Sequence, residues 1–355
     1  MPKFDRIIII SDGIRGHYHQ SLGVAQWLER LGGGHLEESV NVPKLSGINK
    51  LLRLKLSVHG LAVKDSAYSR KWLRFVGMDC RGVKPNTLFI SAGSSAAPFT
   101  LAFAKATGNK SAVIMTPSVL GTKPFDYAII PEHDKHSPED KHILTTTGAP
   151  NHIYLPELEQ AGSSFFAGHD FGNNKVVALL IGGSDNNYKP SPEWAENALG
   201  TLRSLDGIKL LITTSRRTGK ALDDKIEAMF GQDKSLGYML IMSKDSGVNV
   251  LPAMLGKATH VIVTEDSVSM VSEAATAGFR VGLLRVPRTS GFLKRLAGAG
   301  AQRFDDMFAK MEARNLLVDL GNAPDFMKFL YEPDQRHHQD FNDAKRAAEW
   351  ILSQP

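Results

Sequence analysis

Cysteine is almost absent from this sequence: among 355 residues only Cys80 carries a thiol, so no internal disulfide can form. Such a composition is typical of proteins kept in a reducing cytosolic compartment. Long apolar runs are absent too, since none approaches the roughly 18 residues that a transmembrane helix needs. The start, with four isoleucines at 7–10 preceded by Asp5, does not fit a signal peptide. We therefore expect a cytoplasmic protein that could still lie peripherally on the inner face of a membrane.

Several catalytic signatures are missing as well. The sequence has no Walker P-loop, no HExxH, no CxxC and no GxSxG motif, and its histidines show no convincing metal-ligand spacing. It also lacks a DxD motif, the commonest metal-binding carboxylate pair of nucleotide-sugar enzymes. We therefore expect no metal and no cofactor other than a co-substrate. The charge balance, 42 basic against 37 acidic residues, is too even to indicate nucleic acid as a partner.

What the sequence does contain is an alternation of short, β-branched apolar segments with longer stretches of helical period. The expected strands are 6–11, 87–91, 112–116, 127–131, 142–146, 176–181, 209–214, 260–264 and 280–285. The expected helices include 20–31, 193–204, 220–230, 268–277 and 341–351. This alternation is typical of parallel sheets that are covered by helices on both faces, and hence of an α/β fold.

Two such series predict two Rossmann-like αβα domains that face each other across a central cleft. We place the N-terminal, acceptor-side domain at residues 1–160 and the C-terminal, nucleotide-sugar-binding domain at 174–335. Residues 150–174, which are rich in Gly, Ser and acidic side chains, are expected to form the linker. Residues 336–355 are expected to form a C-terminal helix that packs back on the N-terminal domain.

Ligands of doubly wound sheets bind where the strands lead into helices, so the loops after the strands are the candidates for function. After the first strand, Asp12 and His17 could accept a proton, and Arg15 could hold an anion. The other acceptor-side candidates of this loop and of the loop after the next strand are Gly13, Gly16, Gln20, Ser91 and Gly93. An ordinary turn with a polar helix cap remains the alternative for both loops.

Two loops of the second series could meet phosphates. Gly182, Gly183 and Ser184 end a strand, where backbone N–H groups could bind phosphate oxygens, although a plain β-turn explains them too. The next loop places Ser215, Arg216, Arg217 and Thr218 before a helix that starts at Lys220. Cations at a helix N-terminus are mildly unfavourable, so this group indicates a compensating anion such as a diphosphate. A solvated basic turn is the alternative.

The segment 264–278 adds candidates for the nucleotide and its sugar. Either Asp266 or Ser267 could simply cap the helix that follows. Glu265 places a second carboxylate beside Asp266, and Ser269 is a further candidate. Glu273 lies among small residues, so a carboxylate here could accept hydrogen bonds from the vicinal hydroxyls of a sugar.

A basic window from Lys44 to Lys84 contains ten Lys or Arg and only two acidic residues, with leucines and aromatic residues interleaved. The stretch 51–58 alternates like a strand as readily as it fits a helix. The window could contact an anionic membrane surface and a glycolipid there. A solvated basic face over an ordinary core explains it equally well.

Several segments, taken in order, resemble one protein family. They are Asp12-Gly13 with Gly16-His17 and Gln20, Ile90-Ser91-x-Gly93 with Pro98, Phe125-Asp126 with Pro131-x-His133-Asp134, residues 147–151, residues 181–184 with Tyr188, residues 214–218 and residues 263–274. The segment from Ser269 to Gly278 is similar to the helix that grips the nucleotide in GT-B-type glycosyltransferases. The whole set resembles the family named after a plant mitochondrial-fission protein, the "elongated mitochondria" family, many of whose bacterial members are regarded as glycosyltransferases.

The resemblance implies a GT-B-like fold and a nucleotide-sugar site mainly in the second domain. Our leading hypothesis is a metal-independent glycosyltransferase that moves a sugar from a nucleotide-sugar donor to a glycolipid or lipopolysaccharide-type acceptor. In it, Arg216 and Arg217 neutralise the leaving diphosphate, Glu273 holds a hydroxyl, and Asp12 or His17 takes the proton of the acceptor. The alternatives are a non-catalytic adaptor that retains the fold, as in mitochondrial fission, and a sugar-nucleotide epimerase.

Overall fold

The structure is a computed structural model, and it describes residues 2–43, 58–134, 140–245, 247–289, 302–322, 325–333, 336 and 340–355. The segment 51–57, whose form the sequence leaves open, lies outside the described residues. The chain divides into two compact units, Met1–His152 with Asn342–Pro355 and Ile153–Phe341. Within the described part of the chain, every helix falls short of the length and hydropathy that a membrane span requires.

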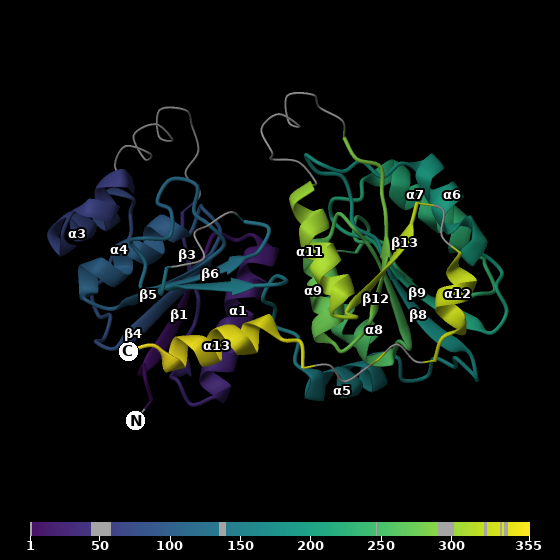
Figure 1. Cartoon of the computed structure of the whole chain (residues 1–355), viewed down its shortest axis with the longest axis horizontal. Helices are drawn as coiled ribbons and strands as arrows, with labels where there is room; N and C mark the ends of the chain where they lie inside the picture. Colours follow the sequence, from purple (N-terminus) through teal and green to yellow (C-terminus); the bar gives the residue numbers. More distant parts are fainter. Residues whose placement is uncertain are drawn as a thin grey trace. The chain divides into compact units, whose positions relative to one another are not determined.

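The first unit is built on a parallel sheet of short, buried strands (Figure 1). The strands are β1 (Arg6–Ser11), β2 (His35–Leu36), β3 (Val40–Asn41), β4 (Thr87–Ala92), β5 (Lys110–Ile114), β6 (Tyr127–Pro131) and β7 (Ile143–Thr146). Their order is β2-β1-β4-β5-β6-β7, and β3 also pairs with β1. The chain therefore winds outward in both directions from β1 and β4, as in a doubly wound sheet.

Helices cover both faces of this sheet, and strand alternation assigns each face its own core. Ile8 and Ile10 of β1 pack on the side of α3 (Ser66–Phe75) and α4 (Ala97–Thr107). Ile7 and Ile9 face the opposite side, where α1 (Arg15–Arg30) and the C-terminal helix α13 (Asp343–Ser353) lie together. The C-terminal helix thus packs back on the N-terminal unit, as the sequence predicted.

The second unit contains a six-stranded parallel sheet. Its strands are β8 (Lys175–Leu180), β9 (Ile208–Thr213), β10 (Leu236–Leu240), β11 (His260–Thr264), β12 (Val281–Leu284) and β13 (Leu317–Gly321). They run in the order β10-β9-β8-β11-β12-β13, which is the strand order of a Rossmann fold. After β8 the chain continues to β9 on one side, and after β11 it continues to β12 on the other side. The crevice between the carboxyl ends of β8 and β11 is therefore the topological switch point.

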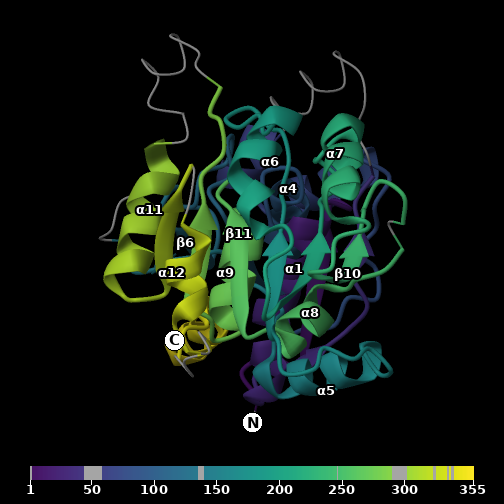
Figure 2. The ribbon, with the colours of Figure 1, turned by 90° about the vertical axis from the view of Figure 1, so that its right-hand side faces the viewer.

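The helices of the second unit are α5 (Leu155–Phe165), α6 (Pro192–Leu199), a short 3₁₀ turn at Gly200–Leu202, α7 (Lys220–Phe230), α8 (Leu251–Lys257), α9 (Val268–Thr276), α11 (Gln302–Ala313) and α12 (Phe326–Tyr331). Residues 150–174, expected as a linker, instead contain α5, which lies against α8 (Figure 2). The two helices approach closely because a Cβ on Gly256 would stand only 1.8 Å from the carbonyl oxygen of Leu158. Gly162, a glycine of the expected linker, lies at the same contact, since a Cβ there would stand 2.9 Å from the backbone of Gly256.

Candidate functional site

In the first unit, an Asp–His pair lies just beyond the end of β1. Asp12 follows the strand, and His17 lies in the first turn of α1. The Nδ1 atom of His17 is 2.8 Å from Oδ2 of Asp12, while Oδ1 of Asp12 accepts the backbone N–H of Ile14. The Asp12 side chain is only 4% exposed, whereas that of His17 is 23% exposed. Asp12 therefore fixes the ring, and Nε2 of His17 remains available for proton transfer.

Gly93, which follows β4, makes room for this ring. Its φ is +82°, a conformation that L side chains rarely adopt. A Cβ at Gly93 would stand 2.4 Å from the ring of His17. Because β1 and β4 are neighbours, this contact lies at the switch point of the first sheet. The structure thus brings together Asp12, His17 and Gly93, three of the residues chosen from the sequence.

The other acceptor-side candidates lie in the core, in the turn before α1 or in the first turns of α1. Ser91 is fully buried, and its Oγ accepts a hydrogen bond from Thr100 at 2.7 Å, so its hydroxyl is part of the core. Gly13 adopts φ +77° in the turn before α1. Arg15 and Gly16 are half-buried in the first turn of that helix, and Gln20 is buried one turn later.

A histidine pair that the sequence gave no reason to single out lies beside α1. The rings of His19 and His152 are 4.2 Å apart, and burial, with His19 and Arg15 nearby, lowers the pKa of His152 to about 4. His152 is therefore neutral at physiological pH. The two residues are 133 positions apart, and only the fold brings them together.

In the second unit, the amides of the Gly182–Ser184 turn are already satisfied. The N–H of Gly182 donates to Oγ1 of Thr264, that of Gly183 to Oδ2 of Asp266 at 2.6 Å, and that of Ser184 to the carbonyl of Arg217. The sequence led us to expect these amides to be free for phosphate, and in this structure they are not. The glycines are needed because the chain itself approaches: a Cβ on Gly182 would lie 2.0 Å from the Asp266 carboxylate.

Asp266 is the centre of this arrangement. It follows β11, and its side chain is fully buried. Its Oδ2 accepts from Gly183 and from Nη2 of Arg217 at 3.2 Å, while its Oδ1 has no hydrogen-bond partner among the described residues. Burial raises the pKa of Asp266 to about 6, although the Gly183 N–H, the Thr264 hydroxyl and Arg217 act in the opposite direction. An anion therefore sits at the switch point of the second sheet, held by one amide and one guanidinium.

The two adjacent arginines of the loop after β9 have different surroundings. Arg217 folds over the Gly182–Ser184 turn and reaches the backbone oxygens of Gly183 and Asp266 at 3.4 Å. Arg216 is exposed, and no described residue pairs with it. Thr218 is buried; its hydroxyl donates to the carbonyl of Gly182 and accepts the N–H of Ser215. Thr218 and Ser215 therefore shape the loop, and Arg216 is its free cation.

Helix α9 begins beside Arg217 without a side-chain cap. Ser267 occupies the N-cap position but makes no capping hydrogen bond, and the first turn contains no acidic residue. The backbone amides of the first turn, at Val268, Ser269 and Met270, have no acceptor within the helix. Glu273, one turn after Ser269 on the same face, is 7% exposed. The amino end of α9 is thus a half-buried, partly positive surface at the switch point.

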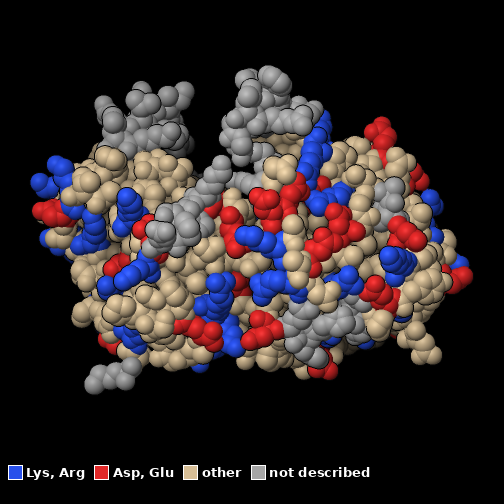
Figure 3. Space-filling view, viewed as in Figure 1, with Lys and Arg blue, Asp and Glu red and all other residues tan. Residues whose placement is uncertain are grey.

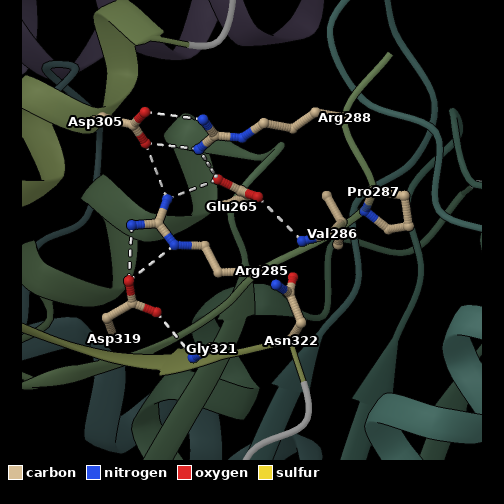
Figure 4. A pocket seen from close by; sticks show the side chains of 9 residues that line it. All are labelled: Glu265, Arg285, Val286, Pro287, Arg288, Asp305, Asp319, Gly321 and Asn322. Atoms are coloured by element: carbon tan, nitrogen blue, oxygen red, sulfur yellow. Dashed lines mark hydrogen bonds and ion pairs between the residues drawn. The ribbon is translucent and has the colours of Figure 1, made fainter. Parts of the chain in front are cut away.

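Glu265, the neighbour of Asp266, points to a different part of the sheet edge (Figure 4). Its side chain is 1% exposed, and its carboxylate accepts the Val286 N–H, Nη1 of Arg285 at 2.8 Å and Nη2 of Arg288 at 2.7 Å. Asp305 of α11 also binds both arginines. Glu265 therefore has little capacity to contact a ligand directly, and it holds the segment after β12 in place.

These charged groups line a hollow of about 650 Å³ beyond β11, β12 and β13. Asp319 completes the network by pairing with Arg285 at 2.7 Å, and Gly321 and Asn322 form the far wall (Figure 4). The sequence does not reveal this network, because its bonded partners are up to 34 residues apart. No local spacing connects Arg285 and Arg288 to their three carboxylates.

Comparison with known proteins gives a family and a fold. The family described as "Mitochondrial fission ELM1" matches residues 15–354. No curated protein matches the chain. A UDP-GlcNAc 2-epimerase from Methanocaldococcus jannaschii is similar in structure, with a TM-score of 0.54 at 12% identity over 98% of each chain.

Two further solved structures cover nearly the whole chain at lower similarity. A UDP co-structure of MnaA from S. aureus has a TM-score of 0.49 at 11% identity, covering 98% of this chain and 95% of that one. A glycosyl transferase of family 9 from Veillonella parvula has a TM-score of 0.45 at 12% identity, covering 99% and 98%. At these identities the comparison concerns the fold, which is that of GT-B glycosyltransferases and related epimerases.

Proposed function

Because this chain belongs to the mitochondrial fission ELM1 family and has a GT-B-like fold, we propose that it is a glycosyltransferase. The second unit would bind a nucleotide-sugar donor, and the first would take the proton of the acceptor hydroxyl. The observation that carries this proposal is the uncapped amino end of α9, which lies beside Arg217 at a topological switch point.

The donor diphosphate would bind at the amino end of α9. Three amides of the first turn lack intrahelical acceptors, and the helix dipole adds partial positive charge there. Arg217 is anchored nearby through the backbone oxygen of Asp266, and the unpaired Arg216 extends from the same loop. Together they would stabilise the charge that develops on the leaving diphosphate, which is the part a metal ion plays in other transferases.

Glu273 and Ser269 would contact the ribose or the donor sugar. They are four residues apart and therefore share one face of α9. A carboxylate in this position can accept hydrogen bonds from two vicinal hydroxyls. Glu265 would be a positioning residue, because its carboxylate is already occupied by Arg285, Arg288 and the Val286 amide.

His17 would act as the general base, with Asp12 as its orienting partner. The Asp12 carboxylate accepts from Nδ1, which leaves the lone pair of Nε2 for the acceptor hydroxyl. As His17 takes the proton, Asp12 stabilises the imidazolium. We propose a glycolipid or lipopolysaccharide-type hydroxyl as the acceptor.

Calorimetric titration with nucleoside diphosphates, beginning with UDP and GDP, tests the donor site. We expect one of them to bind, and we expect Arg216→Ala to weaken binding about tenfold or more without changing stability. Lys234→Ala, which removes an exposed cation of the same unit, is the control. Absence of binding by all nucleotides, or equal binding by wild type and Arg216→Ala, would contradict the proposal.

One observation favours a second candidate, a non-catalytic adaptor that retains the fold. The amides of the Gly182–Ser184 turn are already bonded within the chain, and a carboxylate already occupies the anion position beside Arg217. An adaptor would show no nucleotide affinity and would recover one stoichiometric protein partner. Conversion of a nucleotide-sugar to its epimer without any acceptor would instead indicate an epimerase.

A further inference from the structure

The outer face of α3, in the first unit, is basic from Arg70 to Arg74. Its sequence contains no acidic residue, and the exposed positions Ala67, Arg70, Lys71 and Arg74 recur at helical spacing. The opposite face, with Trp72 and Leu73, is buried in the core. The basic face is therefore permanently directed away from the core.

The neighbouring helix adds no compensating acid. Helix α4, against which α3 packs, also lacks Asp and Glu. Over residues 58–86 the chain has six Lys or Arg and two Asp, a net charge of +4. Both aspartates are engaged locally: Asp65 caps α3 through the Tyr68 N–H, and Asp79 pairs with Arg81. The charge at Lys71 and Arg74 has no partner among the described residues.

A small hollow of about 220 Å³ opens at the carboxyl end of α3. Its polar lining is Arg70, Arg74, Asp79, Arg81 and Thr107, and its apolar lining includes Met78 and Leu73. Arg70, on the rim of the hollow, donates to the Ala106 carbonyl at 2.8 Å. Arg70 and Arg74, together with the Arg81 that Asp79 pairs with, surround a partly apolar hollow. Guanidinium groups in such a setting match a phosphate that carries a hydrocarbon substituent.

Two exposed apolar side chains flank the basic face. Val63, before α3, is 72% exposed, and Phe75, at its end, is 69% exposed. Aromatic and aliphatic residues beside a basic helix face are the usual means by which peripheral proteins enter the headgroup layer. Basic side chains predominate on the part of the first unit where Figure 1 places α3 (Figure 3).

We propose that this α3 face, defined by Val63, Arg70, Lys71, Arg74, Phe75 and Arg81, docks on an anionic lipid bilayer, with one lipid phosphate in the hollow at its end. Within the basic window Lys44–Lys84, this one helix face is the part that would contact the membrane. It deepens the proposed transferase function by naming the surface on which a glycolipid acceptor is met. It needs no turnover, so its failure is distinguishable from failure of the donor site.

The test is co-sedimentation of the full chain with vesicles of phosphatidylcholine alone or with about a third phosphatidylglycerol. We expect binding only to the anionic vesicles, weakening as salt is raised. Each basic residue near such a surface contributes about fivefold to binding, so Lys71→Gln/Arg74→Gln/Arg81→Gln should weaken it about 100-fold. This variant leaves Arg70, which holds α3 to α4, in place.

The control variant removes the same charge from paired surface lysines of the second unit. Lys220→Gln/Lys225→Gln/Lys234→Gln should bind anionic vesicles nearly as well as wild type. Phe75→Ser should remove the part of the binding that resists salt. Equal binding to neutral vesicles, or equal loss in both triple variants, would overturn the proposal.

Cys80, the single thiol, lines the hollow and reports on its occupation. Anionic vesicles should slow the reaction of Cys80 with a thiol reagent at least severalfold, and neutral vesicles should not. Inorganic phosphate is the second arm. If millimolar phosphate protects Cys80 while anionic vesicles neither protect it nor bind the chain, the hollow is a free-phosphate site, and the lipid proposal is wrong.

Discussion

Replacing Asp266 by asparagine should separate the energetic cost of its buried charge from its hydrogen bonds. Its side chain is fully buried, and burial raises its pKa from 3.8 to about 6. The folded state therefore binds this proton more tightly than the unfolded state between about pH 4 and pH 6. Stability must fall as the pH rises through that window, and the lost stability remains absent above it. Asparagine keeps an oxygen for the Gly183 N–H and cannot ionise.

The size of this stability change follows from the pKa shift of Asp266. A difference of about two pKa units corresponds to about 3 kcal/mol between the protonated and ionised states. Because the unfolded carboxyl is already more than half ionised at pH 4, Asp266→Asn should gain about 2 kcal/mol relative to wild type when the pH is raised from 4 to 7. Urea unfolding of variant and wild type at pH 4 and pH 7 measures this change in their stability difference. Groups that titrate alike in both proteins cancel from it. Asp224→Asn, which removes an exposed carboxylate of the same unit, is the control for the loss of a surface charge.

The opposite sign would refute the reasoning. If wild type gained stability over Asp266→Asn as the pH rose, the ion pair with Arg217 would outweigh burial, and the carboxylate would be a stabilising anion. A difference independent of pH would mean that Asp266 does not titrate in this window at all.

Three further variants test the sites described above. Gly93→Ala should destabilise the first unit by about 1–3 kcal/mol in thermal or urea unfolding, because φ is +82° and the new Cβ would meet the His17 ring; stability equal to wild type would show that the ring is not fixed there. Glu265→Gln should cost about 3 kcal/mol of unfolding free energy, since Arg285 and Arg288 lose a fully buried partner, whereas the exposed change Glu196→Gln should cost almost nothing. His17→Asn should lower sugar transfer about 100- to 10,000-fold with unchanged stability, and an activity near wild type would remove His17 as the base.

The strands were the part of the fold that the sequence predicted well. Arg6–Ser11, Tyr127–Pro131 and His260–Thr264 have the bounds expected from buried β-branched runs that end in polar or Gly residues. Helix α4, Ala97–Thr107, was missed because nearly all of its residues are buried. A helix surrounded by core has no polar face, so it shows no helical period in its sequence.

The candidate sites were predicted in position rather than in detail. Polar residues after β1 and β11 identified both switch points, because loops at strand ends are read directly from the chain. The sequence left two explanations open for the Gly182–Gly183 pair, since a glycine that admits a ligand and a glycine that admits its own chain look alike in sequence. Only the contact with Asp266 shows that the second explanation applies here.

A structure with a bound nucleoside diphosphate tests the central proposal most directly. The account predicts that the phosphate oxygens lie within about 3 Å of the first-turn amides of α9, at Val268, Ser269 and Met270, with the Arg216 guanidinium on the same phosphates. A nucleotide bound elsewhere, with Arg216 still directed into solvent and these amides unoccupied, would contradict it.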